Sequence, residues 1–314
     1  MNYSEDILKE AFEQQTIILD NDYEGKAVST LIRRKSETST NKAILYVHGF
    51  NDYFFQKELA YQFNDHNINF YAIDLRKYGR SYLLHQKFND IRDLKSYYEE
   101  IVKALDIIHN EDNNEVILMG HSTGGLILTL FAKDYSGNNL FDGLILNSPF
   151  YDFNLPLHLK LLIPVASVLG KIIPSIKIKG GFTEEYGKSI HKNYYGEWDY
   201  NLKWKPNIAP KVNLGWIRAI HRGQMELRKP FYIQQPVLIL HSAQSITDKN
   251  DKYQIQTTDT ILNVIQINRI AHNIRANVQI ESIAGGLHDL ILSDKSVRNN
   301  VYSTIFSWWE KENF

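Results

Sequence analysis

The chain of 314 residues contains no cysteine and no excess of charge of either sign. Without cysteine it can form no disulfide, no thiolate metal site and no cysteine nucleophile. Lysine plus arginine (35) nearly equals aspartate plus glutamate (36), which leaves a formal net charge of −1. A chain with this charge balance does not have the broad basic surface of nucleic-acid binders, so we expect no nucleic-acid partner.

Long hydrophobic runs are also missing. No stretch approaches the roughly 18 uninterrupted apolar residues of a membrane-spanning helix, so we expect no stable membrane insertion and leave transient membrane contact open. The first residues, MNYSEDILKEAFEQQ, are polar and acidic, unlike a signal peptide. A cytoplasmic location follows as the expectation. The chain is nevertheless 43% hydrophobic and 12% aromatic, enough for a sizeable core.

Short apolar runs alternate with helical patterns, which predicts an α/β fold with a mostly parallel sheet. Runs such as AILYV, VILM, LILN and VLIL are continuously apolar, as in strands covered on both faces. Eight strands are predicted: Gln15–Leu19, Ala27–Arg34, Ala43–Val47, Asn69–Ile73, Val116–Met119, Gly143–Leu146, Val237–Leu240 and Val278–Ile283. Five helices are predicted: Gln56–His66, Ile91–Asn110, Gly124–Asp134, Val264–Arg275 and Val297–Lys311.

The alternation stops between residues 150 and 230, where aromatics are frequent and no strand pattern is clear. We interpret 150–230 as a helical cap (lid) inserted into a core formed by 1–149 and 231–314. Such a cap would lie over the carboxyl ends of the strands, where open α/β sheets bind ligands. Its apolar run LPLHLKLLIPVASVLGKIIPSIKI (155–178) is compatible with lining an acyl-chain pocket and equally with packing onto the core.

Residues 120–124, Gly-His-Ser-Thr-Gly, match the G-x-S-x-G nucleophile elbow. The serine of this motif adopts an unfavourable backbone conformation, so the residues two before and two after it must be small. The apolar run VILM before the motif and LILTLFA after it supply the required strand and helix. The pattern therefore predicts Ser122 as a catalytic nucleophile.

A serine hydroxyl needs a base, and His288 stands where α/β-hydrolases carry theirs, in the loop GGLHD between the last strand and the last helix. The acid that orients this histidine is expected after the strand VLILH, but SAQSIT follows without a carboxylate. Asp248, Asp251 and Asp259 are the candidates. Asp259 is preferred because Asp259-Thr-Ile-Leu-Asn263 leads into a helix that Asn263 can cap.

The oxyanion formed during acyl transfer needs preorganised donors. The backbone N–H of Thr123, which follows the nucleophile, is one candidate. The second is the N–H of Phe50, because Gly49 in AILYV-His48-Gly49-Phe50 allows a turn at the end of a strand. No metal-ligand spacing and no phosphate-binding loop occurs, so no metal and no cofactor are predicted.

Together these residues resemble the serine α/β-hydrolases that include monoacylglycerol lipases, lysophospholipases and the serine aminopeptidases of family S33. Five stretches carry the resemblance: YVHGFNDYFF (46–55), FYAIDLRKYGRS (70–81), MGHSTGG (119–125), LILNSPF (144–150) and GGLHDLILS (285–293). The resemblance implies an eight-stranded sheet, a cap over the site and no cofactor. The sequence departs from the family at Lys77, where glycine is usual, and in a lengthened acid loop.

Three functions are compatible with these features. The first is a serine hydrolase that cleaves carboxylic esters such as monoacylglycerols, lysophospholipids or short acyl esters. The second is an amino-terminal peptidase, which would need an acidic group of the cap to hold the substrate ammonium. The third is a ligand sensor without turnover, whose sequence would show an eroded triad. Acidic residues of the cap available for the second function are Glu184, Glu185, Glu197 and Asp199.

Overall fold

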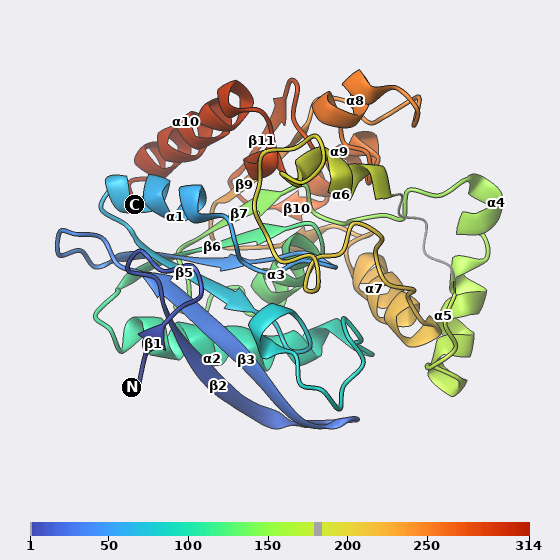
Figure 1. Cartoon of the computed structure of the whole chain (residues 1–314), viewed down its shortest axis with the longest axis horizontal. Coiled ribbons are helices and arrows are strands. Elements are labelled where there is room, and N and C mark those ends of the chain that lie inside the picture. The colour runs from blue at the N-terminus through green and yellow to red at the C-terminus, as the bar shows by residue number, and fades with distance from the viewer. Residues whose placement is uncertain (1, 179–183) are drawn as a thin grey trace.

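A computed structural model describes residues 2–178 and 184–314, which build a twisted nine-stranded sheet with helices on both faces (Figure 1). The strand order is β1-β2-β3-β5-β4-β6-β7-β9-β11. The bounds of these strands are β1 Ser4–Glu5, β2 Glu13–Asp22, β3 Gly25–Arg34, β4 Lys42–Val47, β5 Asn69–Asp74, β6 Glu115–His121, β7 Gly143–Asn147, β9 Val237–Ser242 and β11 Val278–Ile283.

All eight predicted strands are present, and the two-residue strand β1 adds a ninth. From β5 through β11 every neighbouring pair is parallel, whereas β2 and β3 form an antiparallel hairpin at the edge of the sheet. The predicted α/β architecture with a mostly parallel sheet is therefore confirmed. The parallel arrangement places the carboxyl ends of β4, β6, β7 and β9 at one edge of the sheet, and the loops that follow them converge there.

Alternate side chains of the strands enter two separate cores, one on each face of the sheet. In β4, Leu45 enters the first core and Tyr46 enters the second. Helices α2 (Tyr98–His109), α3 (Thr123–Asp134) and α9 (Val264–Ala271) cover the first face. Helices α1 (Lys57–Asp65) and α10 (Lys295–Lys311) cover the second (Figure 1).

Between β7 and β8 the described residues form four helices, which lie beside the sheet rather than on one of its two faces (Figure 1). Of these, α7 packs against both α5 and α3 and so connects the group to the sheet. The bounds are α4 Leu157–Lys160, α5 Ile163–Ile172, α6 Glu184–Ile190 and α7 Leu214–Glu226. No helix among residues 2–178 and 184–314 is both long and apolar enough to cross a membrane.

Two predictions about these elements need correction. The helix expected over Val264–Arg275 ends at Ala271, because Ile274–Arg275 (β10) pairs in parallel with Phe231–Tyr232 (β8) as a separate small sheet. The apolar run 155–178 was expected to line a pocket or to pack on the core. Ile163, Ala166 and Ile178 do pack against the first core, but most of the large side chains of the run are exposed, among them Leu157 (74%) and Ile176 (49%).

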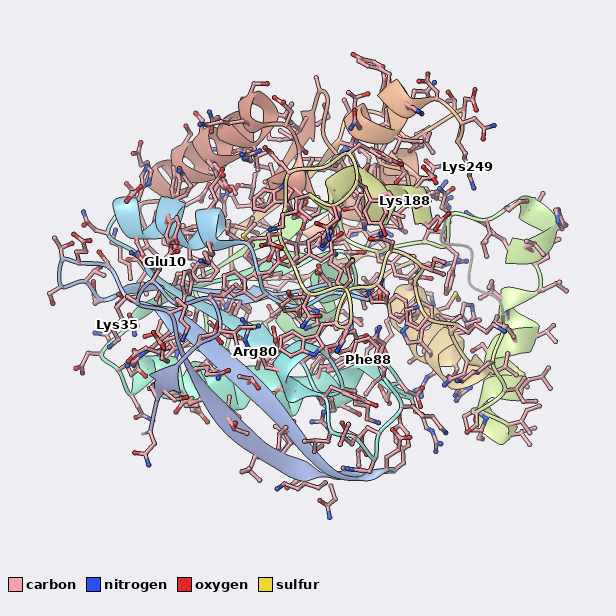
Figure 2. The ribbon with its side chains drawn as sticks, viewed as in Figure 1. Glu10, Lys35, Arg80, Phe88, Lys188 and Lys249 are labelled. Carbon is pink, nitrogen blue, oxygen red and sulfur yellow. The ribbon has the colours of Figure 1, made fainter. Side chains whose placement is uncertain are left out.

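The stretch DLRKYGRS (74–81) fixes the loop that follows β4. Oδ1 of Asp74 accepts a hydrogen bond from the Phe54 N–H (2.8 Å), and its Oδ2 accepts one from Arg80 Nη1 (2.8 Å). Arg80, labelled in Figure 2, has a side chain that is only 4% exposed. Lys77 adopts a φ of 68° with its side chain fully buried, and its ammonium pairs with Asp22 (2.7 Å) and with a second carboxylate of the same hairpin turn. The lysine thus attaches the edge hairpin to the loop.

Candidate active site

Ser122 lies at the sharp turn between the end of β6 and the start of α3. Its backbone has φ 51° and ψ −113°, a conformation that residues with a side chain rarely adopt. The close packing of the turn explains the two flanking glycines. A Cβ atom on Gly124 would lie 2.3 Å from the Val47 carbonyl oxygen, and one on Gly120 would lie 2.8 Å from the backbone of Gly124. The turn therefore has the strand-turn-helix form expected of a nucleophile elbow.

A chain of two hydrogen bonds joins Ser122, His288 and Asp259. The His288 ring nitrogen Nε2 lies 3.0 Å from Ser122 Oγ, and its Nδ1 lies 2.9 Å from Asp259 Oδ2. Because a carboxylate only accepts, Nδ1 carries the proton and leaves Nε2 free to accept from the serine hydroxyl. The three side chains are buried, with exposed fractions of 8%, 4% and 0%.

Asp259 is held rigidly although it follows a long loop. Its Oδ1 accepts from the backbone N–H groups of Ile261 (2.8 Å) and Leu262 (2.7 Å), which leaves Oδ2 for the histidine. The other two candidates for the acid lie away from His288. Asp251 caps the short helix α8 (Lys252–Thr257) by accepting from Tyr253 N, and Asp248 is exposed and accepts from Asn250 N.

The two predicted oxyanion donors line the same cavity as Ser122. Thr123 is the first residue of α3, so its N–H belongs to the helix terminus, where no intrahelical acceptor exists. Phe50 follows Gly49, and a Cβ atom on Gly49 would lie 3.1 Å from the Ser122 Cβ. A glycine at position 49 therefore lets the Phe50 backbone approach the nucleophile closely.

His48 supports this turn as a neutral imidazole. Its Nε2 accepts from the Leu75 N–H (3.0 Å), so Nδ1 is the protonated nitrogen and donates to the Gly49 carbonyl (2.7 Å). Burial lowers the pKa of His48, and nearby carboxylates only partly oppose this effect. Both ring nitrogens are satisfied only in the uncharged form.

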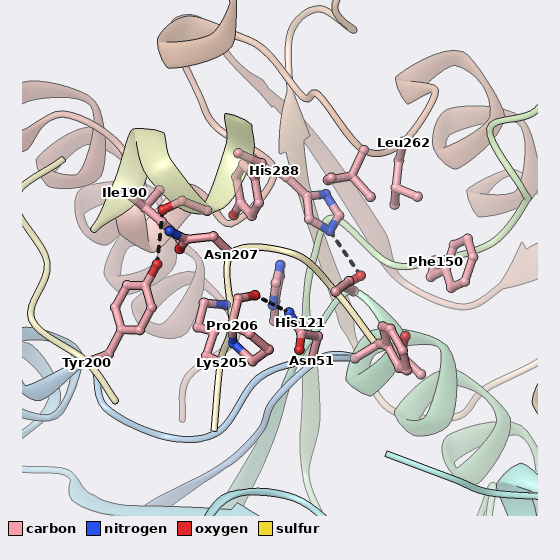
Figure 3. A pocket seen from close by; sticks show the side chains of 17 residues that line it. Asn51, His121, Phe150, Ile190, Tyr200, Lys205, Pro206, Asn207, Leu262 and His288 are labelled. Atoms are coloured by element: carbon pink, nitrogen blue, oxygen red, sulfur yellow. Dashed lines mark hydrogen bonds between the residues drawn. The ribbon is translucent and has the colours of Figure 1, made fainter. Parts of the chain in front are cut away.

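The cavity over Ser122 has a polar and an apolar side, separated by His288 (Figure 3). Its space amounts to about 680 Å³, including the part open to solvent. The polar groups of Tyr200, Lys205 and Asn207 lie on one side, together with Ile190 and Pro206, whereas Phe150 and Leu262 lie on the other side (Figure 3). Tyr186, Tyr200, Lys205 and Asn207 come from the segment between β7 and β8, whereas Ile261 and Leu262 follow β9.

A buried ionic network lies directly below this cavity. Lys205 Nζ is 2.9 Å from Asp52 Oδ1, and His121 Nδ1 lies 3.6 Å from Asp52 Oδ2 and 3.8 Å from Asp289 Oδ2. Burial alone would raise the pKa of Asp52, but Lys205 and His121 outweigh it and hold that pKa below its usual value.

The carboxyl oxygens of Asp52 and Asp289 and the ring nitrogen of His121 lie within 4.8 Å of one another, close enough to hold a metal ion. Lys205 already supplies a positive charge to Asp52. Asp289 accepts from Asn147 Nδ2 (2.7 Å) and from the Ile291 N–H (3.2 Å). We therefore interpret the cluster as a charge-compensated support for the site. Sequence reasoning missed Lys205 because 153 residues separate it from Asp52.

The four acidic residues considered for gripping a substrate ammonium do not line the cavity. Each pairs with a cation elsewhere: Glu184 and Glu185 with Lys188, Glu197 with Arg298, and Asp199 with Lys192. The Lys188 side chain is itself only 25% exposed. These carboxylates are thus committed to other ion pairs.

Comparison with known proteins agrees with the fold and the motifs. The serine aminopeptidase family S33 matches residues 38–295. The chain belongs to this family of α/β-hydrolases. No curated protein sequence gives a significant match.

Solved structures of the same fold include a soluble variant of monoglyceride lipase from Saccharomyces cerevisiae in complex with a substrate analogue. That structure has 18% identity and a TM-score of 0.69, with 96% of this chain and 97% of that chain covered. Monoacylglycerol lipase from Paleococcus ferrophilus has 17% identity and a TM-score of 0.64, with 90% and 99% covered. Est1E from Butyrivibrio proteoclasticus with ferulic acid bound has 15% identity and a TM-score of 0.59, with 94% and 98% covered. At these identities the similarity establishes the shared fold.

Proposed function

We propose that this α/β-hydrolase is a cytoplasmic serine esterase that cleaves carboxylic esters through an acyl-enzyme. The observation that carries the proposal is the continuous chain from Ser122 Oγ through His288 to Asp259. An intact series of hydrogen bonds between these three side chains argues against a ligand sensor that has lost turnover. In this proposal residues 1–149 and 231–314 form the catalytic core, and residues 150–230 form the cap that closes the cavity.

The proposed reaction has two stages. Ser122 Oγ attacks the ester carbonyl carbon while His288 Nε2 takes its proton, and Asp259 stabilises the resulting imidazolium. The oxyanion accepts hydrogen bonds from the N–H groups of Phe50 and Thr123. The C–O bond then breaks, the alcohol leaves with the proton from His288, and a water molecule activated by the same histidine releases the acid and restores Ser122.

The two-sided cavity supports the choice of substrate class. Phe150, Ile261 and Leu262 offer an apolar wall to an acyl chain, and the opposite side carries amide, phenol and ammonium groups suited to a polar alcohol. Monoacylglycerols, lysophospholipids and short acyl esters all combine these two parts. A peptidase reaction has less support, because the four cap carboxylates pair with other cations and lie outside the cavity.

The test is turnover of p-nitrophenyl esters from acetate to palmitate, with the Ser122→Ala variant as control. We expect hydrolysis by the natural protein, none by the variant, and an optimum of chain length set by the apolar wall. Labelling by a fluorophosphonate reports the nucleophile independently of the substrate. A natural protein that neither hydrolyses any ester nor becomes labelled would overturn the proposal, whereas labelling without ester turnover would favour the peptidase reaction.

A further inference from the structure

The outer surface of α4 and α5 is unusually apolar for a surface facing water. Among the described residues, 21 large hydrophobic side chains are exposed, and ten of them lie between positions 157 and 176. Single exposed aliphatic residues are normal, but a contiguous group marks an interaction surface. We call these ten the α4–α5 face: Leu157, Leu159, Leu161, Leu162, Val165, Val168, Leu169, Ile172, Ile173 and Ile176.

The helix α5 is oriented with its small residues inward. Ser167 and Gly170 are buried, and a Cβ atom on Gly170 would lie 2.2 Å from the Leu214 carbonyl oxygen at the start of α7. The large side chains Val165, Val168, Leu169 and Ile172 recur at the three- and four-residue spacing of one helix face. That face points away from the protein, and Figure 1 shows α5 at the edge of the molecule with α7 between it and the sheet.

The same segment is basic although the whole chain is nearly neutral. No aspartate or glutamate occurs between positions 153 and 183, whereas lysine occurs at 160, 171, 177 and 179. Lys171 and Lys177 are exposed, and Lys160 pairs with Asp152, which also faces Arg228 at 3.8 Å. Asp152, the acidic residue that precedes this segment in the sequence, is therefore already matched by two cations. An apolar helix face bordered by lysines fits a negatively charged interfacial layer.

We propose that the α4–α5 face docks on the surface of a lipid membrane that carries anionic headgroups. The aliphatic side chains enter the boundary between headgroups and acyl chains, and Lys171 and Lys177 contact the lipid phosphates. A second copy of the chain is the less suitable occupant, because the lysines of the two copies would face each other. This inference goes beyond the proposed esterase activity and does not depend on it.

The test measures binding to vesicles of phosphatidylcholine with and without phosphatidylglycerol, using full-length protein that carries Ser122→Ala so that no lipid is hydrolysed. We expect binding to the anionic vesicles that weakens as salt is added. The double variant Val168→Glu/Ile172→Glu should lower the apparent affinity by roughly tenfold or more, because charges replace two aliphatic side chains that would enter the membrane. The double variant Lys171→Glu/Lys177→Glu should lose the preference for anionic vesicles.

Leu84→Glu is the matched control, since Leu84 is 94% exposed but lies outside the face. It should bind vesicles like the parent protein, and circular dichroism should show the same fold for every variant. Equal binding by Leu84→Glu and Val168→Glu/Ile172→Glu, or no binding by the parent protein, would overturn the proposal. A parent dimer in sedimentation that dissociates in Val168→Glu/Ile172→Glu, together with no vesicle binding, would assign the face to a second copy instead.

Discussion

The ammonium group of Lys205 lies 2.9 Å from Oδ1 of Asp52, two positions beyond the proposed oxyanion donor Phe50. Asn51 Nδ2 adds a hydrogen bond to the Pro206 carbonyl oxygen (2.9 Å). Two consecutive residues after Phe50 are thus attached to two consecutive residues of the segment between β7 and β8. This segment and the oxyanion turn form one structural unit.

We expect Lys205→Met to lower the free energy of unfolding by about 3–5 kcal/mol, because it leaves the buried Asp52 carboxylate uncompensated. The double variant Lys205→Met/Asp52→Asn should lose less than the sum of the two single changes. Urea unfolding measures all three. Lys192→Met is the control, because Lys192 and Asp199 form an exposed pair with side chains 50% and 69% exposed. If the losses of unfolding free energy in the two single variants simply add in the double variant, Lys205 and Asp52 are not energetically coupled.

Asp259→Asn should reduce turnover by about 10⁴-fold while the protein stays folded. The amide oxygen would keep the backbone N–H groups of Ile261 and Leu262, so the NH₂ group would face His288 Nδ1 and favour the unproductive tautomer. Asp251→Asn and Asp248→Asn should keep turnover near that of the natural protein. Initial rates on the best p-nitrophenyl ester measure the three variants side by side. An equal loss in Asp251→Asn would point to a different acid.

Ser122→Gly should be more stable than Ser122→Ala by about 1 kcal/mol. Both variants lose the bond to His288, but only glycine adopts φ 51° and ψ −113° without strain. Chemical unfolding of the two inactive variants under identical conditions measures the difference. Equal stabilities would mean that the turn stores no strain at position 122.

The stability of the protein should fall as the pH is lowered from 7 to 5, in part through His48. Burial lowers the pKa of His48, so below its unfolded value of about 6.5 the unfolded chain binds a proton that the folded chain refuses. The lost stability is regained as the pH rises through that value. His48→Gln should flatten this part of the profile in urea unfolding at several pH values. His272→Gln, which changes an exposed histidine, should leave the slope unchanged.

The central strands β4, β5, β6, β7 and β9 could be predicted because apolar runs buried on both faces leave a clear pattern. The hairpin strand β2 instead alternates buried and exposed side chains over Ile17–Asp20. The two-residue strands β1, β8 and β10 leave no pattern, and the pairing of Ile274 with Phe231 ends a helix that the local pattern would continue.

Ser122, His288 and Asp259 could be proposed as the site from the sequence because the serine and the histidine lie in motifs that follow a strand, and the structure brings the three side chains together. The motifs around Ser122 and His288 match the family patterns closely. Asp259, in contrast, is one of three aspartates in the same polar loop.

Long-range relationships could not be predicted. Nothing near Lys205 indicates that its charge is neutralised by Asp52, because the contact depends on how the segment 184–213 crosses the cavity. The exposure of the α4–α5 face was also not predictable. Apolar residues at helical spacing predict a buried face only when the helix turns that face inward, and here Gly170 and Ser167 take the inward position.

The two ends of the loop between β9 and Asp259 are joined by backbone hydrogen bonds. Asp259 N donates to the Gln244 carbonyl (2.9 Å) and Ile246 N donates to the Asp259 carbonyl (2.9 Å). Residues 247–257 therefore form an excursion whose two ends lie next to each other. Length changes within that excursion do not propagate to the carboxylate. The long loop of this chain can therefore reach α6 through α8 while the hydrogen bonds at Asp259 still place the acid beside His288.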